Sequence, residues 1–140
     1  MISVLIDTNV VLDYAEEREV FYEAAQKVFE IIRHRKIIGC ISASAITDIF
    51  YFLQKRYKEA GVAISLLKKL IRILEVLAVD RQTIEAAIEL GMVDFEDAVQ
   101  VTAAKRFDIN IDIVITRDKT GFLDSGLNVY SPEEFLETLK

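Results

Sequence analysis

Four aspartates occupy positions from which they could act together: Asp7, Asp48, Asp97 and Asp118. Carboxylates brought close to one another repel, and their pKa values rise unless a cation lies among them. Sites that offer oxygen ligands, with no histidine or cysteine nearby, select hard ions such as Mg²⁺ or Mn²⁺. The chemistry open to these residues is therefore that of a hard divalent cation.

Each of these carboxylates also has an ordinary structural explanation. Asp7 can cap the short helix "TNVVLDY", and Asp118 can form a turn. Asp97 falls at the third position of a helix capped by Asp94, where an acid favours the helix dipole. Asp48 points away from the apolar stripe of its helix, which favours exposure to solvent. The functional interpretation rests on the combination of four carboxylates compatible with one crevice.

The surroundings of two of the aspartates favour function. The helix that contains Asp97 carries apolar or small residues around almost its whole circumference, so we expect it to be buried. Asp48 has Ala45 and Phe52 one turn to either side, so its helix face is expected to meet protein. Burying a carboxylate costs free energy unless it has a partner or a bound ligand. We therefore expect a partner or a ligand at both Asp48 and Asp97.

Short apolar strands alternate with helices along the chain. Strands are expected at 2–6, 37–41, 76–79, 112–116 and 127–130, and helices at 21–35, 44–58, 59–74, 81–90, 94–107 and after the Ser131 cap. This order predicts one domain over residues 1–140, a three-layer α/β/α sandwich with a mostly parallel sheet of four to five strands. In such sheets the ligand crevice lies beyond the carboxyl ends of the strands, where Asp7 and Asp118 are expected.

Composition excludes several other classes of protein. No apolar run approaches the roughly 18 residues of a membrane span, no basic leader is seen, and the single Cys40 fits a reducing compartment, so we expect a soluble cytoplasmic protein. The net charge of −6 argues against non-specific nucleic-acid binding, unless several acids are gathered in one site. The single histidine, His34, is expected at the surface, which excludes a ribonuclease built on paired histidines.

Four segments in order resemble one known family. The segments "LIDTNVVLD", "SASAITDI", "DFEDAVQVTAAK" and "IVITRDKTGF", closing on "VYSPEEFL", are similar to the PIN domain, including the VapC-type toxins of toxin–antitoxin pairs. The resemblance covers essentially the whole chain. It implies a ribonuclease that depends on Mg²⁺ or Mn²⁺ and leaves 5′-phosphate and 3′-hydroxyl ends.

The resemblance also implies roles for individual residues. Asp7, Asp48, Asp97 and Asp118 match the family's acidic positions; Asp7, Asp97 and Asp118 are expected to hold the metal, while Asp48, shorter than the glutamate common there, orients water. The expected supporting residues are Asn9, Asp94 and Thr116. Further implications are an RNA substrate, a small antitoxin partner that covers the acidic crevice, and a homodimer.

Two cations flank Asp118 in the sequence. Because Arg117 and Lys119 lie beside an expected metal ligand, we predict that they contact substrate phosphate. The other basic clusters, including "RHRK" and "KRYK", are expected to be mostly solvated helix faces.

Two alternatives remain open from the sequence. The segment "LIDTNVV" also resembles the start of haloacid-dehalogenase-like phosphohydrolases, but Asn9 stands where that family has its general-acid aspartate. The helix "AISLLKKLIRILEVL" has more leucine and isoleucine than one stripe needs, so a non-catalytic interaction module is the second alternative.

Overall fold

One parallel sheet of five strands forms the centre of the molecule. The computed structural model describes residues 1–107 and 110–140, and its strands stand in the order β3-β2-β1-β4-β5. Their bounds are β1 (Ser3–Ile6), β2 (Ile38–Ser42), β3 (Glu75–Leu77), β4 (Ile111–Ile115) and β5 (Asn128–Tyr130). The predicted parallel sheet is confirmed. The predicted strand at 76–79 was placed too late, because β3 ends at Leu77.

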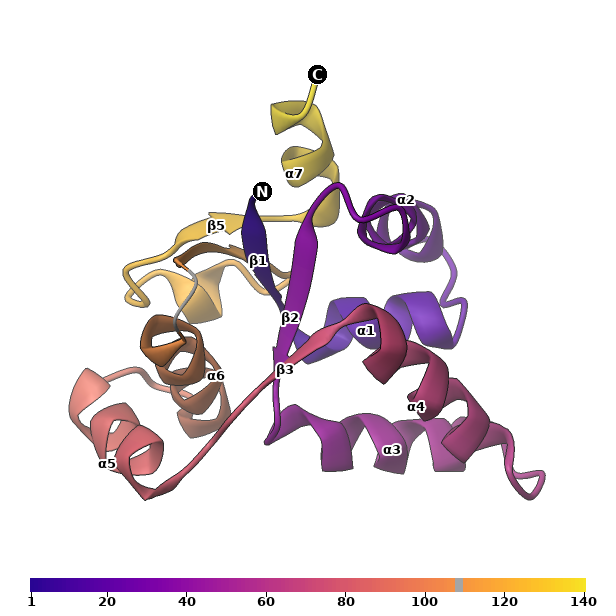
Figure 1. Cartoon of the computed structure of the whole chain (residues 1–140), viewed down its shortest axis with the longest axis horizontal. Helices are drawn as coiled ribbons and strands as arrows, with labels where there is room; N and C mark the ends of the chain where they lie inside the picture. The colour runs from indigo at the N-terminus through magenta and orange to yellow at the C-terminus, as the bar shows by residue number, and fades with distance from the viewer. Residues whose placement is uncertain (108–109) are drawn as a thin grey trace.

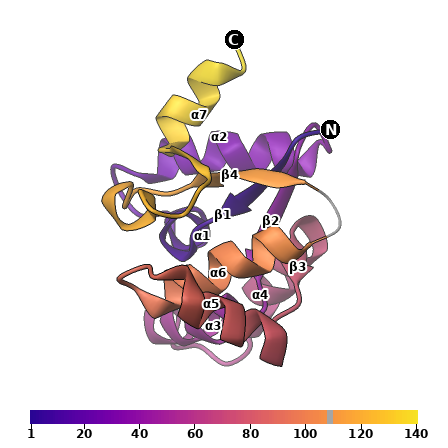
Figure 2. The same cartoon turned by 90° about the vertical axis from the view of Figure 1, so that its left-hand side faces the viewer.

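Helices cover both faces of this sheet. Within the described residues they are α1 (Thr8–Ala15), α2 (Tyr22–Arg33), α3 (Ala45–Arg56), α4 (Val62–Ile73), α5 (Arg81–Leu90), α6 (Phe95–Arg106) and α7 (Pro132–Thr138). Figure 1 shows α5 and α6 on one side of the strands and α1 to α4 on the other. Figure 2 brings the α5–α6 pair to the front. This arrangement confirms the three-layer α/β/α sandwich.

Local capping residues fix where several helices begin. Asp80 accepts a hydrogen bond from the Thr83 backbone amide at 2.9 Å, and the two residues form a capping box at the start of α5. Ser131 and Glu134 form a second capping box at α7, with a proline in its first turn. Both starts agree with the sequence prediction, although Thr83 was not foreseen as the partner of Asp80.

The two sides of the sheet have separate apolar cores. Val4, Ile6 and Ile115 point toward α1 to α4, while Leu5 and Val114 point toward α6. Strand residues alternate between these cores because successive side chains leave a strand on opposite faces. The sheet is therefore buried on both sides, as parallel sheets usually are.

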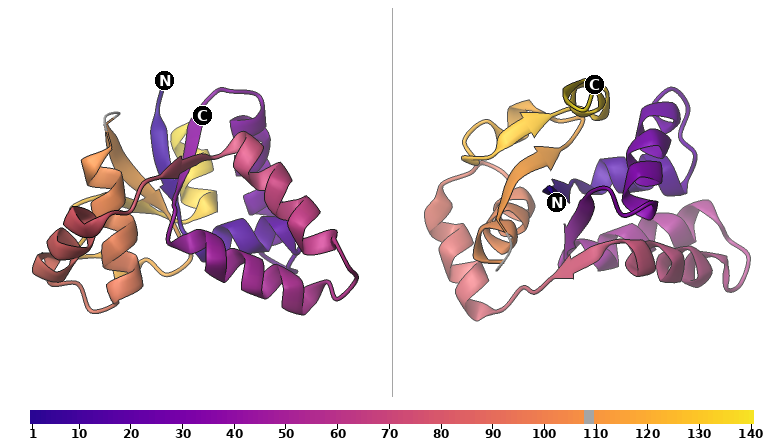
Figure 3. Two further views of the ribbon diagram at one scale, coloured as in Figure 1. Left: turned by 60° about the horizontal axis from the view of Figure 1, so that its bottom comes forward. Right: turned by 45° about the horizontal axis from the view of Figure 1, so that its top comes forward.

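Two further sequence predictions concern buried and exposed faces. Cys40 is fully buried, and this burial raises the pKa of its thiol to about 12. Helix α4 packs beside α3, a pairing visible in Figure 3, and buries Ala63 and Leu70 while Ile64 and Ile71 stay exposed. The leucine-rich segment thus contributes to the core and also leaves apolar side chains at the surface. No helix in the described part of the chain is long and apolar enough to cross a membrane.

Strand β1 lies at the point where the order of the sheet reverses. Its two neighbours are β2, which follows it in the chain, and β4, which comes much later. The carboxyl ends of β1 and β4 meet because Ile6 pairs with Ile115, and the Asp7 amide continues the ladder by donating to the Ile115 carbonyl at 3.0 Å. Asp7 and Thr116 therefore leave the sheet side by side.

Candidate active site

Asp7 is held by hydrogen bonds from three elements. Its Oδ1 accepts from the Thr8 backbone amide at 2.8 Å, as the N-cap of α1, and from Gln100 Nε2 of α6 at 3.4 Å. Its Oδ2 accepts from Thr116 Oγ1 at 2.7 Å. Asp7 therefore caps α1, and it also lies at the carboxyl end of β1, where the sequence predicts the ligand crevice.

The carboxyl group of Asp7 is in an environment that disfavours its charge. The residue is 6% exposed, and its burial is the largest cause that raises its pKa above the ordinary value. The hydrogen bonds from Thr116, Thr8 and Gln100 oppose this rise, while the charge of Asp118 adds to it. A cation beside Asp7 would relieve both the burial and the repulsion.

Asp97 and Asp118 approach one another around Gly121. A Cβ atom on Gly121 would lie 2.6 Å from Asp118 Oδ2 and 3.3 Å from Asp97 Oδ2, so both carboxylates face the same small space. The Gly121 amide donates to Asp118 Oδ1 at 3.2 Å, and Thr116 Oγ1 accepts from the Asp118 amide at 2.9 Å. A side chain at position 121 would therefore displace the Asp118 carboxylate from its present position.

Helix α6 delivers Asp97 from its first turn. Asp94 is the N-cap and accepts from the Asp97 backbone amide at 3.0 Å, as the sequence predicted. The pKa of the Asp97 carboxyl is raised to about 7, first by burial and then by the charges of neighbouring acids, among them Asp7, Asp94 and Asp118. Residues 98–104 of α6 are all buried, which confirms the expected burial of this helix.

Asp48 lies on the first turn of α3, beside a cavity of about 210 Å³ between α3, α5 and α6. It is half-buried, and its carboxyl lies within hydrogen-bonding reach of Glu96, which raises the pKa of Glu96. The partner that the sequence required for Asp48 is thus another acid. Asp48 therefore lies at the same end of the sheet as Asp97, because its neighbour Glu96 directly precedes Asp97 on α6.

Three polar residues of this region were missed by sequence reasoning. They are Glu96, Gln100 and Asp124; the last lines a cavity of about 350 Å³ together with Asp94, Asp97, Asp118 and Gly121. The spacing of four residues between Glu96 and Gln100 places both on one face of α6, which was a usable signal. Asn9 is the second residue of α1, and its Oδ1 is buried without a hydrogen-bond partner in the described part of the chain.

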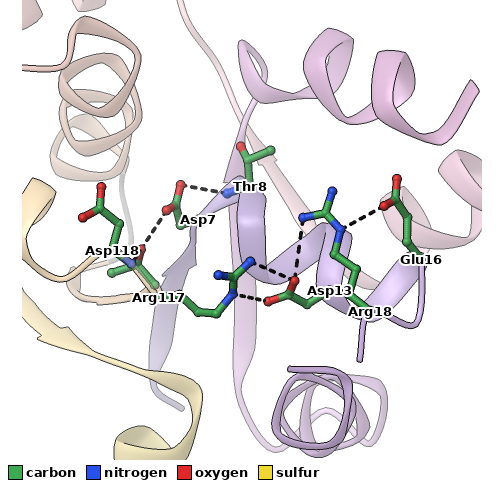
Figure 4. Close-up of polar contacts among 8 residues, drawn as sticks. Asp7, Thr8, Asp13, Glu16, Arg18, Arg117 and Asp118 are labelled. Atoms are coloured by element: carbon green, nitrogen blue, oxygen red, sulfur yellow. Dashed lines mark hydrogen bonds and ion pairs between the residues drawn. The ribbon is translucent and has the colours of Figure 1, made fainter. Parts of the chain in front are cut away.

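The two cations that flank Asp118 are both paired with carboxylates. Arg117 donates to Asp13 through Nε at 2.6 Å and through an Nη nitrogen at 3.1 Å, and its guanidinium stacks on Phe21. Figure 4 shows Arg117 extending toward Asp13 while Asp118 lies on the side of Asp7. Lys119 Nζ lies 2.9 Å from both carboxylate oxygens of Glu134.

The Arg117 pair ties two parts of the site together. Asp13 is fully buried on α1, the helix that begins at Asp7, and Arg117 directly precedes Asp118. Arg18 adds a second cation at 3.7 Å from Asp13. Arg117 therefore fixes the loop that carries Asp118 against α1, and its contact with substrate phosphate stays a prediction.

The residues present match a hard divalent cation in the type of ligand that they offer. Asp7, Asp97 and Asp118 supply oxygen atoms, and the space at Gly121 is bounded by two of the three carboxylates. In residues 1–107 and 110–140, no three acidic, histidine or cysteine side chains are already arranged to hold one ion together. Burial and, after it, the charges of neighbouring acids raise the pKa of Asp97, and a cation among these carboxylates would offset both effects.

The fold and this acidic site agree with a known family. The model of the PIN domain matches residues 3–120, and the chain belongs to the PIN domain family. This confirms the resemblance seen in the sequence. Among characterised proteins, the chain is 30% identical over 140 residues to Ribonuclease VapC1 of Aquifex aeolicus (strain VF5), an alignment that covers 96% of this chain and 94% of that protein.

Solved structures share the fold at lower sequence identity. VapBC from Salmonella typhimurium, solved bound to DNA, contains a chain with a TM-score of 0.69 and 17% identity, covering 94% of this chain and 99% of its own. VapBC2 from Rickettsia felis, bound to a DNA fragment from the promoter, contains a chain with a TM-score of 0.67 and 13% identity. That match covers 93% of the present chain and 98% of the Rickettsia chain. These similarities establish the fold.

Proposed function

We propose that this chain is an endoribonuclease that hydrolyses RNA phosphodiester bonds with the help of Mg²⁺ or Mn²⁺, in one nuclease domain over residues 1–140. The observation that carries the proposal is that Asp97 and Asp118 face one small space at Gly121, at the end of a PIN-domain sheet where Asp7 leaves β1. The relative named Ribonuclease VapC1 supports the reaction.

The three aspartates are the proposed metal ligands. When bound, a divalent cation supplies Lewis-acid stabilisation of the phosphate and acidifies water for attack. The chain's own part is to hold these carboxylates in place. Thr116 fixes Asp7 through one hydrogen bond and the Asp118 backbone through another, so a single side chain sets the separation of two ligands.

The remaining polar residues have supporting roles in this proposal. Asp94 orients the first turn of α6, and Asp48 with Glu96 lies beside the metal ligands, where Asp48 can position water. Asn9 is a supporting residue near the start of α1. Arg117 and Lys119 are the proposed phosphate contacts. Lys119 is the more available of the two, because its pair with Glu134 is exposed and such pairs exchange readily.

We also propose that the chain acts as the toxin of a toxin–antitoxin pair. The similar chains from VapBC assemblies support a small antitoxin as its partner. A homodimer is part of this proposal and rests on the family resemblance. The haloacid-dehalogenase alternative loses its basis, since the chain belongs to the PIN domain family and carries Asn9 where that chemistry needs an acid.

The proposed reaction is tested by cleavage of labelled single-stranded and structured RNA. Purified protein is incubated with Mg²⁺, with Mn²⁺ or with excess chelator, beside Asp97→Asn and the control Asp112→Asn, which changes an exposed aspartate of β4. We expect metal-dependent cleavage with 5′-phosphate ends that is lost in Asp97→Asn and kept in the control. Cleavage that survives in the chelator or in Asp97→Asn would contradict the proposal, and failure to bind metal or cut any RNA would favour the interaction module.

A further inference from the structure

A small cavity beside the acidic site has the size of a single nucleobase. It lies between α3, α5 and α6, and its volume of about 210 Å³ is below the roughly 300–1,000 Å³ usual for sites that take larger ligands. Thr8, which follows Asp7, is part of its wall, so the cavity adjoins the proposed metal ligands. An occupant of this cavity would lie next to the scissile phosphate.

The cavity has an apolar wall and an exposed aromatic ring. Val79, Ile84 and Val99 line it, and the Phe95 side chain, 49% exposed, stands at the beginning of α6. An exposed phenylalanine beside an apolar wall is suited to stack against a flat aromatic base. Because such stacking accepts any base, these residues would contribute affinity without choosing among bases.

The polar side of the cavity consists mainly of hydrogen-bond acceptors. Asp48 and Glu96 place carboxyl groups there within reach of each other. Gln100 lines the same cavity and is 5% exposed. Its Nε2 donates to Asp7, and its Oε1 has no hydrogen-bond partner among the residues that the structure describes. A buried amide oxygen without a partner is unfavourable, so this atom calls for a donor from a ligand.

We propose that this cavity is a base-recognition subsite that accepts guanine next to the cleaved phosphodiester. Guanine presents N1–H and N2–H₂ side by side, a fork of two donors that matches a carboxylate as the arginine guanidinium does. Adenine and cytosine place an acceptor nitrogen beside their amino group, and uracil flanks its single N–H with two carbonyl oxygens. The hydroxyl of Ser44 also lines the cavity and is hydrogen-bonded to the Ser42 hydroxyl at 2.8 Å. It can donate to guanine O6 when Ser42 is the donor of that pair.

This inference rests on the proposed ribonuclease function and deepens it by naming the preferred cleavage site. The predicted preference for guanine over the other bases is about tenfold or more, the size of one bidentate base contact. Replacing guanosine by inosine removes N2–H₂ and should lower this preference by a similar factor.

The test maps the 5′-phosphate ends produced from a randomised RNA. We compare the native protein with Glu96→Gln, which replaces one of the two acceptor oxygens with an NH₂ donor. The control is Glu89→Gln, a change at an exposed glutamate of α5 outside the cavity. Guanine enrichment at one fixed position beside the cut, reduced in Glu96→Gln and kept in the control, supports the inference. No base enrichment, or enrichment unchanged in Glu96→Gln, overturns it.

A binding measurement separates this inference from the cleavage reaction. Guanosine and uridine 5′-monophosphates are titrated into ¹⁵N-labelled protein in chelator, and the Phe95, Glu96 and Gln100 signals are followed. Selective shifts with the guanosine nucleotide support the subsite even if no RNA is cleaved, and the proposed reaction alone then fails. Equal responses to both nucleotides, or no response here while RNA is cut, overturn the subsite and leave the reaction standing.

Discussion

Replacing Asp97 by asparagine is expected to make the metal-free protein more stable at and above pH 7. The carboxyl of Asp97 has a pKa of about 7 in the folded protein and an ordinary value of 3.8, so the folded state binds this proton more tightly than the unfolded state. Burial is the main cause, and the charges of Asp7, Asp94, Asp118 and Glu96 add to it. A neutral side chain removes both unfavourable effects.

The size of the gain follows from this difference in pKa. A difference of about three pKa units corresponds to about 4 kcal/mol in the free energy of unfolding, because one pKa unit is about 1.4 kcal/mol. Because Asp97 is only half-buried, screening by solvent reduces the expected gain to about 1–2 kcal/mol, or about 3–8 °C in Tm for a domain of this size. The stability contributed by the protonated carboxyl is present below the unfolded pKa and is lost as the pH rises through the folded pKa. The gain of Asp97→Asn should therefore grow between about pH 4 and 7 and stay constant above.

Urea unfolding followed by circular dichroism, in chelator and at several pH values between 4 and 8.5, measures this gain. Asp112→Asn, on the exposed part of β4, is the control and should change stability little at any pH. Asp97→Asn that is no more stable than the native protein at pH 8, or equally stabilising at pH 4 and pH 8, would refute the reasoning.

Three further predictions concern the metal ligands and their supports. Mg²⁺ or Mn²⁺ at millimolar concentration should raise the Tm of the native protein and raise that of Asp97→Asn much less, because a ligand of the folded state stabilises by mass action. Gly121→Ala should reduce metal-dependent cleavage at least tenfold with little loss of stability, since its Cβ would lie 2.6 Å from Asp118 Oδ2. Arg117→Ala should lower the free energy of unfolding by about 3 kcal/mol, because it leaves the buried Asp13 carboxylate without its bidentate partner.

Each of these predictions has a control and an outcome that contradicts it. Differential scanning fluorimetry in Ca²⁺-free buffers measures the metal-induced rise in Tm. An equal rise in Tm for the native protein and for Asp97→Asn would contradict the first prediction. Leu123→Ala, an exposed residue of the same loop, should keep the activity that Gly121→Ala loses. Arg33→Ala breaks an exposed pair with Glu30 and should cost less than about 1 kcal/mol, so equal losses in Arg33→Ala and Arg117→Ala would contradict the role given to Asp13.

Much of the fold could be predicted from local patterns in the sequence. Strand β1 could be predicted from its apolar run, because both of its faces are buried. The burial of α6 could be predicted because small and apolar residues surround its circumference. The caps at Asp80, Asp94 and Ser131 lie within three residues of the amides that they bind, so their signals are local. The weakest boundary was that of β3, a strand of three residues with two of them exposed.

The side-chain partners could not be predicted because they come from distant parts of the chain. Arg117 meets Asp13, and Lys119 meets Glu134, whose capping role was visible while its lysine partner was not. This lysine holds the pKa of the Glu134 carboxyl down to about 2. The sequence likewise marked Asp48 as needing a partner, but only the fold, which brings the first turns of α3 and α6 to one cavity, identifies Glu96.

The proposed reaction requires Asp7, Asp97 and Asp118 to form a metal site. Crystals soaked in MnCl₂ and measured at a wavelength with strong manganese anomalous scattering test it most directly. We expect an anomalous peak in the space beside Gly121, contacted by these carboxylates, and its loss in crystals of Asp97→Asn. A map without a peak there at millimolar Mn²⁺, or with a peak of equal height in Asp97→Asn, would contradict it.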